Sequence, residues 1–155
     1  MFINYNEIMF RIKSGQYAFI GSGSSRKVYD LDNGYVVKVA KNDAGTEQNR
    51  AEFYISQNDD SGLFAKVINV SNDYSMLIMK KAKKVRDVKD VWHYFNAYDK
   101  HEFYKCRPMQ KIKKKYKLLL GDFAKASSWG MIHGKPVIID YGFTEYVEKH
   151  YYRHK

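Results

Sequence analysis

A lysine inside an apolar run is the first residue of this chain that could carry chemistry. Lys38 lies within Tyr35-Val36-Val37-Lys38-Val39-Ala40, where a buried ammonium group would need a counter-charge or a bound anion. Glu52, on the next predicted helix, is a natural partner if that helix packs on the sheet. Strand alternation places Lys38 on the opposite face from Val37 and Val39, so a solvent-facing lysine is an open alternative.

A glycine-rich bend precedes that strand. Gly21 and Gly23 lie in Gly21-Ser22-Gly23-Ser24-Ser25, and without a Cβ their backbone N–H groups can approach a phosphate. The third glycine of the G-x-G-x-x-G pattern is absent, and Arg26 occupies its place. Val28, two residues further on, is a β-branched side chain that could cover an adenine ring. By itself, the run also fits a short flexible hairpin.

These residues lie on elements that the local pattern predicts in the order strand, strand, strand, helix, strand, strand over residues 16–79. A weak helical pattern over 2–13 precedes them, and Asp32-Asn33-Gly34 is typical of a tight turn. Thr46 is the expected N-cap of the helix. The expected ranges are strands at 17–20, 26–30 and 35–40, a helix at 46–57, and strands at 64–70 and 74–79.

The second half is predicted to be mainly helical. Pro108 suits the first turn of a helix that Gly121 ends, with lysines on its wet face. A hairpin turning at His133-Gly134-Lys135 follows, and Thr144 caps a last short helix that reaches Tyr152. The other expected ranges are a helix at 85–97 and hairpin strands at 129–132 and 136–140.

In this order the pieces resemble the protein-kinase superfamily. The matching residues are Gly21-Ser-Gly23-Ser-Ser-Arg-Lys-Val28, Tyr35-Val-Val-Lys38, Glu52, Leu120-Gly121-Asp122 and Asp140-Tyr141-Gly142. The last triplet is similar to D-F-G, and Leu-Gly-Asp is closer to the H-G-D of aminoglycoside-phosphotransferase-like kinases than to H-R-D. The two aspartates are 18 residues apart, as is usual in the family. The resemblance covers about residues 15–145.

The resemblance implies a role for each residue. Lys38 would grip the α- and β-phosphates of ATP, and Glu52 would orient Lys38 through an ion pair. Asp140 would be a Mg²⁺ ligand, and Asp122 the catalytic aspartate. The implied fold is α+β: a small antiparallel sheet with one helix as the N-lobe (about 14–80), and a reduced, mainly helical C-lobe (about 81–155) within one domain.

Three departures separate the chain from the family pattern. Ser127 stands where the family places an asparagine as second metal ligand, and a hydroxyl is a weaker ligand than an amide oxygen. Leu120 and Gly121 replace the histidine and arginine before Asp122. Only 13 residues follow Gly142, which leaves no room for an activation segment. Phosphorylation of protein substrates is therefore in doubt.

Charge is unevenly placed along the chain. The net charge is +10, and residues 80–117 hold 14 Lys and Arg against 4 Asp and Glu, so this basic segment carries the whole excess. Such a field attracts nucleic acid, anionic lipid or an acidic protein surface. A solvated helix face that keeps the protein in solution is an equally open interpretation.

Composition excludes several other classes. No window resembles a membrane span, the N-terminus does not resemble a secretory signal, and the single Cys106 suits a reducing, cytoplasmic compartment. The five histidines show no zinc-binding spacing.

Three hypotheses follow. The first is a minimal phosphotransferase that uses ATP and Mg²⁺, with a protein, a small molecule or the chain itself as acceptor. The second is a pseudokinase or binding module that docks an acidic partner or nucleic acid through residues 80–117. The third is a nucleic-acid-binding protein of unrelated fold.

Overall fold

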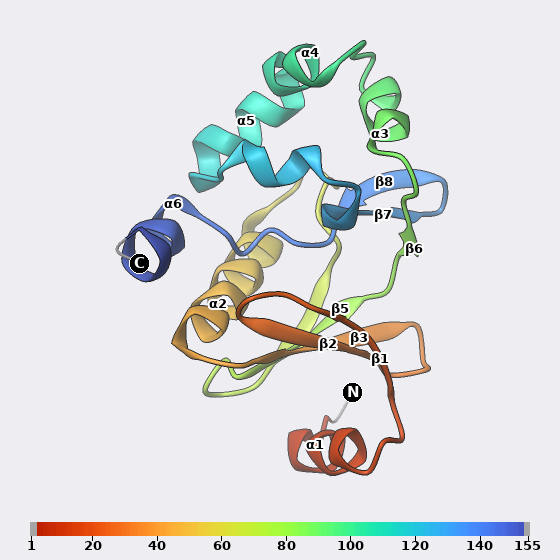
Figure 1. Ribbon diagram of the computed structural model, residues 1–155, viewed down its shortest axis with the longest axis vertical. Coiled ribbons are helices and arrows are strands. Elements are labelled where there is room, and N and C mark those ends of the chain that lie inside the picture. Colours follow the sequence, from red (N-terminus) through yellow and green to blue (C-terminus); the bar gives the residue numbers. More distant parts are fainter. Residues whose placement is uncertain (1–2, 154–155) are drawn as a thin grey trace.

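A five-stranded antiparallel sheet and a mainly helical region make up the part of the chain that the computed structural model describes, residues 3–153 (Figure 1). The sheet region contains α1 (Tyr5–Lys13), β1 (Ala18–Ser22), β2 (Arg26–Asp30), β3 (Tyr35–Ala40), α2 (Asp43–Asn58), β4 (Val67–Val70) and β5 (Met76–Lys80). The helical region contains β6 (Lys83–Lys84), α3 (Val88–Tyr94), α4 (Lys100–Lys105), α5 (Arg107–Tyr116), the 3₁₀ turns η1 (Leu120–Ala124) and η2 (Ala126–Ser128), β7 (Trp129–Ile132), β8 (Lys135–Ile138), α6 (Glu145–Val147) and the π turn η3 (Glu148–Tyr152).

Both faces of the sheet are covered. Its strand order is β1-β2-β3-β5-β4, and every neighbouring pair is antiparallel. Because side chains alternate along a strand, Val37 and Ile78 point to the face on which α1 packs through Ile8. Val36 points to the opposite face and joins the larger core, to which α2 contributes Ile55.

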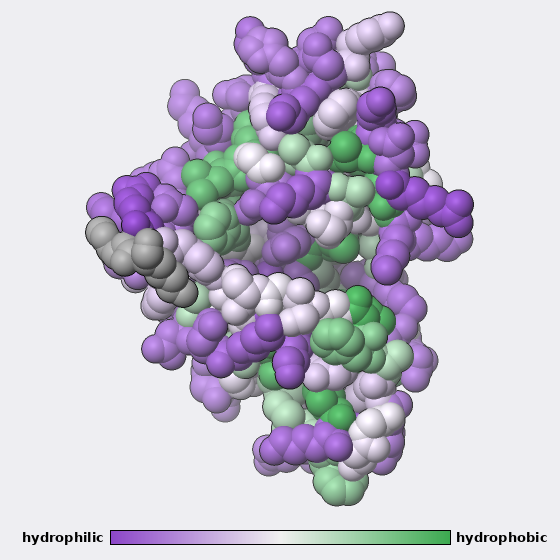
Figure 2. Space-filling view, viewed as in Figure 1, coloured by the Kyte–Doolittle hydropathy of each residue, from purple (hydrophilic) through white to green (hydrophobic). Residues whose placement is uncertain are grey.

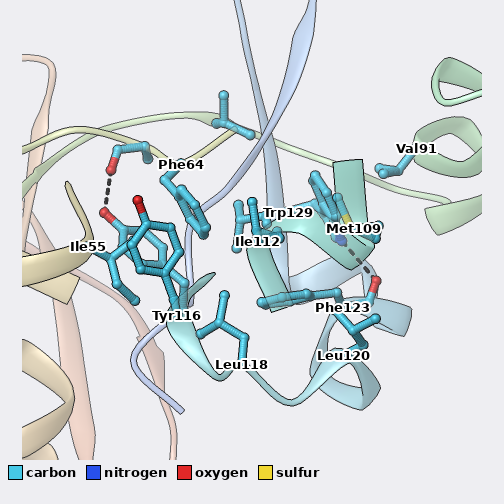
Figure 3. Packing of buried hydrophobic residues seen from close by; sticks show 14 of the residues in the cluster. Ile55, Phe64, Val91, Met109, Ile112, Tyr116, Leu118, Leu120, Phe123 and Trp129 are labelled. Carbon is cyan, nitrogen blue, oxygen red and sulfur yellow. Dashed lines mark hydrogen bonds between the residues drawn. The ribbon is translucent and has the colours of Figure 1, made fainter. Parts of the chain in front are cut away.

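The larger core continues into the helical region. Figure 3 shows Trp129 among Phe123, Ile112 and Met109, four side chains drawn from β7, η1 and α5. All four are almost fully buried. The amphipathic pattern of α5 explains its part, since its apolar side chains face this core and its lysines face solvent.

The α+β architecture predicted from the sequence, an antiparallel sheet with one helix followed by a mainly helical region, is confirmed. The strand–strand–strand–helix–strand–strand order holds, the two hairpin strands form β7 and β8, and the turn between them has positive φ at His133 and Gly134. Thr144 caps the last helix by accepting a hydrogen bond from the N–H of Val147 at 3.2 Å. The helix predicted at the N-terminus is α1; residues 1–2 lie outside the described residues.

The predicted start of the helix that carries Glu52 is wrong. α2 begins at Asp43, and its N-cap is Asn42, whose side chain accepts a hydrogen bond from the N–H of Gly45 at 3.0 Å. Thr46 therefore lies inside the helix. Glycine disfavours a helix, so the local pattern places the helix start after Gly45. The structure requires a glycine there, because a Cβ on Gly45 would lie 2.1 Å from the carbonyl oxygen of Ser25.

Several boundaries differ in the second half of the chain. The helix expected over 85–97 is shorter, because Asp87 caps it by accepting a hydrogen bond from the N–H of Lys89 and it ends at Tyr94. α5 ends at Tyr116, because its C-cap, Lys117, adopts a left-handed conformation, while Gly121 lies within η1. α4 and β6 were not predicted. The strands expected at 64–70 and 74–79 begin later, at Val67 and Met76.

Candidate active site

Lys38 points into the molecule, beneath α2. Its ammonium lies 2.9 Å from Oε1 and 3.1 Å from Oε2 of Glu52 and also donates to the carbonyl oxygen of Ile139. The Lys38 side chain is only 6% exposed and that of Glu52 is fully buried, so the solvent-facing alternative is wrong. The three N–H bonds of Lys38 thus have three acceptors.

Arg26 is a buried member of the candidate site whose contacts sequence reasoning missed. Its guanidinium binds both oxygens of Glu52, at 2.8 and 2.9 Å, and donates to Oδ1 of Asp140 at 2.9 Å. Its side chain is 7% exposed. The only signal in the sequence was that Arg26 replaces the third glycine of the G-x-G-x-x-G pattern. The spacing alone does not indicate a bond to Asp140.

Neighbouring elements hold Arg26 in place. Asn49, fully buried on α2, accepts a hydrogen bond from Arg26 at 3.1 Å, and its own amide donates to the carbonyl of Tyr74, which fixes the amide orientation. The preceding residue, Ser25, accepts from the N–H of Lys41 and lies against Gly45. The start of β2 is thereby attached to α2.

Asp140 is positioned by contacts on both sides. The N–H of Tyr141 donates to Oε2 of Glu52 at 3.0 Å, and the Tyr141 hydroxyl donates to the carbonyl of Ala65 at 2.6 Å. Gly142 packs closely on α2, since a Cβ there would lie 2.7 Å from the carbonyl oxygen of Gln48. The Asp140 side chain itself is 55% exposed. Its carboxylate is therefore accessible from solvent although its backbone is firmly held.

Asp122 lies on the 3₁₀ turn η1, which hydrogen bonds from Ser128 and Trp129 hold in place. Ser128 Oγ donates to the carbonyl of Asp122 at 2.7 Å, and the indole N–H of Trp129 donates to that of Phe123 at 2.9 Å. Burial and the negative charge of Asp140 raise the pKa of Asp122, while Lys125 opposes the shift. Asp122 and Asp140 therefore lie close enough to repel each other. Ser127, by contrast, is exposed on η2.

The glycine-rich bend comprises the end of β1, which contains Gly21 and Ser22, and the turn from β1 to β2. The N–H of Gly23 donates to the carbonyl of Arg26 at 2.9 Å, so this donor is used within the hairpin. Nothing lies within 4 Å of where a Cβ would stand on Gly21 or Gly23. Val28 pairs with Gly21 and with Lys38 in neighbouring strands and packs against the larger core.

Four charged groups form one network whose formal charges cancel: Arg26, Lys38, Glu52 and Asp140. Burial alone would raise the pKa of Glu52, but the charges and hydrogen bonds of Arg26 and Lys38 outweigh it and lower that pKa to about 2. Burial, together with the charge of Arg26, lowers the pKa of Lys38. Glu52 is thus an ionised carboxylate shared by two cations.

The C-terminal turn reaches the glycine-rich bend. The hydroxyl of Tyr152 lies 3.0 Å from Ser24 Oγ, contacts Ser25 Oγ, and accepts a hydrogen bond from the side chain of Gln48 at 3.2 Å. The ring of Tyr152 packs edge-on against Phe143 at 5.0 Å. Figure 1 shows this end of the chain beside α2.

The remaining surface features lie away from this network. A cavity of about 260 Å³ lies between α1 and the sheet and is lined by residues such as Ile8, Tyr17 and Ile78. No cluster of three or more His, Cys, Asp or Glu side chains that could hold a metal occurs within residues 3–153. None of the helices described in that range is long and apolar enough to cross a membrane.

The basic segment, residues 80–117, combines buried apolar residues such as Phe103 and Met109 with an exposed basic surface. All 14 of its Lys and Arg residues are exposed. Only Lys81 forms an ion pair with a carboxylate among the described residues, that of Asp30. Figure 2 shows hydrophilic side chains covering the end of the molecule where α4 lies.

Comparison with known proteins gives a structural match. No protein-family model matches the chain, and no curated protein matches it. Among solved structures, the ternary complex of streptomycin, ATP and the aminoglycoside phosphotransferase APH(2")-IIa is similar, with a TM-score of 0.50 and 19% sequence identity. The match covers 91% of this chain and 73% of that chain. At this identity the likeness shows the fold, which is protein-kinase-like, and it excludes the hypothesis of an unrelated nucleic-acid-binding fold.

Proposed function

We propose that this protein-kinase-like chain is a minimal phosphotransferase that uses ATP and Mg²⁺, built as one domain with an N-lobe at about 14–80 and a C-lobe at about 81–155. One observation carries the proposal. The ammonium of Lys38 lies 2.9 Å from Glu52 and binds the carbonyl of Ile139, the residue that precedes Asp140. The ammonium proposed to bind phosphate thus contacts the residue next to the carboxylate proposed to bind the metal.

Each residue has a role in this proposal. Lys38 binds the α- and β-phosphates, and Glu52 holds its ammonium in place. Val28 covers the base, and the bend with Gly21 and Gly23 approaches the phosphates from the sheet side. Because all three N–H bonds of Lys38 already have acceptors, it can bind a phosphate only by exchanging one of them.

The acidic pair fits a divalent cation. Asp140 raises the pKa of Asp122, which means that two like charges lie near one another, and a cation would relieve their repulsion. Mg²⁺ is commonly held by one or two carboxylates together with phosphate oxygens and water; here Asp140 would be the ligand, with the hydroxyl of Ser127 as a weaker second. When bound, Mg²⁺ would neutralise charge on the phosphates.

Asp122 would orient the acceptor hydroxyl. In the transfer, the bond between the γ-phosphorus and its bridging oxygen breaks, a bond to the acceptor oxygen forms, and Asp122 accepts the hydroxyl proton while ADP leaves. The raised pKa of Asp122 suits a proton acceptor better than that of an ordinary aspartate. The similar solved structure contains ATP, which supports a nucleotide as the phosphate donor.

Transfer of radiolabel from γ-labelled ATP tests the proposal. The wild-type chain should label itself or an added acceptor, while Asp122→Ala and Asp140→Ala should lose at least about 99% of the signal, as expected when a catalytic group is removed. Asp60→Ala changes an exposed aspartate outside the network and serves as the matched control. Equal labelling by all four proteins, or no labelling by any, would reject the proposal.

A second candidate function is a binding module that docks on an anionic partner. The cations of the basic segment favour it, because they are exposed and mostly unpaired. The contact of Arg26 with Asp140 also favours it, because the guanidinium occupies an oxygen of the carboxylate that a phosphotransferase would use to bind Mg²⁺. Reversing the charge at Lys113, Lys114 and Lys115 should then abolish partner binding while Asp122→Ala leaves it intact. A binding isotherm with DNA, RNA or a polyglutamate peptide at low and high salt measures this.

A further inference from the structure

We infer that Arg26 is a built-in counter-ion of Asp140, which keeps a free divalent cation out of the site and admits the cation only together with a nucleoside triphosphate. The inference deepens the proposed function and rests on it. It concerns Arg26, for which the kinase resemblance supplies no role because a glycine stands at this place in the family pattern.

The position of the guanidinium supports this assignment. Nη2 of Arg26 lies 2.9 Å from Oδ1 of Asp140, within the range of a charge-assisted hydrogen bond. A metal ion on the same oxygen would therefore compete with the guanidinium. The cation that neutralises Asp140 in this structure is part of the protein.

Arg26 is also held too firmly to leave the site without a compensating gain. The three other hydrogen bonds of its guanidinium end on Glu52 and Asn49, whose side chains are fully buried. Its backbone follows Ser25, which is attached to Lys41 and lies against Gly45. A metal at Asp140 would therefore be placed next to a cation that cannot retreat far.

Electrostatics then decides which ligand enters. A divalent ion arriving alone could reach Oδ1 of Asp140 only by displacing the guanidinium of Arg26, and it would then lie beside two cations, Arg26 and Lys38, whose charges offset the attraction of the nearby carboxylates. A nucleoside triphosphate brings negative charge that offsets both cations. When the metal–triphosphate complex displaces the guanidinium of Arg26 from Asp140, one of its four hydrogen bonds breaks and those to Glu52 and Asn49 stay intact. The metal–triphosphate complex is thus admitted and the bare metal is not.

Binding of Mn²⁺ in the absence of nucleotide, followed by electron paramagnetic resonance, tests the inference on the whole chain. Arg26→Gln keeps much of the side-chain length and can still donate to Glu52 but removes the charge. We expect it to bind Mn²⁺ at least about tenfold more tightly than the wild type. Adding Asp140→Asn to this variant should abolish the gain. Arg50→Gln neutralises an exposed arginine on α2 and should match the wild type.

Equal Mn²⁺ affinity of the wild type and Arg26→Gln would overturn the inference, as would a gain that survives Asp140→Asn. Arg26→Lys guards against misfolding of the neutral variant, because it retains the charge and should keep the weak affinity of the wild type. Tight Mn²⁺ binding by folded Arg26→Lys would count against the inference. Circular dichroism checks the fold of each variant.

The same proteins separate this inference from the proposed function. Gain of Mn²⁺ binding by Arg26→Gln together with no phosphate transfer by any variant supports the counter-ion and rejects the phosphotransferase. Unchanged Mn²⁺ binding together with transfer by the wild type does the reverse. A third readout uses the wild type alone, in which Mn²⁺ should broaden the carboxyl resonance of Asp140 only after ATP is added. Broadening by Mn²⁺ alone would contradict the inference.

Discussion

The guanidinium of Arg26 and the carboxylate of Asp140, 114 positions apart in the sequence, lie 2.9 Å from each other across the boundary between the sheet and the segment that follows β8. This contact links the glycine-rich hairpin to the proposed metal ligand. Glu52 connects the groups around this contact, because its carboxylate accepts hydrogen bonds from Arg26, from Lys38 and from the backbone N–H of Tyr141. Stability and the proposed ligand binding therefore depend on the same few side chains.

Glu52→Gln should strongly destabilise the fold. The amide removes the negative charge shared by Arg26 and Lys38 and leaves two buried cations, so we expect a loss of about 3–5 kcal/mol in the free energy of unfolding. Urea denaturation measures it. Glu47→Gln on the same helix, which breaks a surface pair with Arg50, should change stability by no more than about 0.5 kcal/mol. Equal losses in the two variants would contradict the prediction.

Acid should unfold the protein through the same carboxylate. The pKa of Glu52 is lowered from 4.5 to about 2 in the folded state. The stabilisation is therefore present above pH of about 4.5 and is lost as pH falls toward about 2. The loss is on the order of 3 kcal/mol, since one pKa unit corresponds to about 1.4 kcal/mol.

Denaturation curves collected between pH 6 and about pH 2 would reveal this loss. The Glu52→Gln variant should show a flatter dependence over that window, because the group that takes up the proton is missing. An identical pH profile for wild type and variant would mean that other carboxylates govern the acid transition.

Gly142→Ala should destabilise the chain and disturb Asp140. An added Cβ would meet the carbonyl oxygen and the Cα of Gln48 at 2.7 and 2.9 Å, and backbone atoms in a helix cannot move aside cheaply. We expect a loss of about 1–3 kcal/mol by thermal unfolding. In the control Gly121→Ala, the new methyl group enters open space, so stability should hold or rise slightly. A neutral Gly142→Ala would show that this contact is looser than described.

Tyr152→Phe should release the C-terminal turn from the glycine-rich bend. The change removes the hydroxyl that contacts Ser24, Ser25 and Gln48, and we expect a loss of about 0.5–1.5 kcal/mol. Amide hydrogen exchange at residues 22–26 should become faster. Tyr146→Phe alters an exposed tyrosine of α6 and should leave that exchange unchanged. Protection that is identical in the two variants would indicate that the bend is ordered without Tyr152.

The sequence by itself determined the order of the elements and most of the residues of the proposed site. Lys38 within a β-branched run, Asn33-Gly34 at a turn and Asp140 after an apolar strand are local patterns that depend on near neighbours, so they could be predicted without the fold. A short helix such as α4 spans too few turns for periodicity to reveal it, and the bounds of α3 depend on its caps. The end of α5 depended on the left-handed conformation of Lys117, which no pattern indicates.

Only the tertiary structure decided where the charged side chains point. Alternation along β3 gives Lys38 a face but does not say which face α2 covers, and that choice separates a buried ion pair from a solvated lysine. The role of Arg26 depends on Glu52 and Asp140, which are 26 and 114 positions away. Contacts over such separations arise from packing of the whole chain, because local sequence constrains only the backbone of near neighbours.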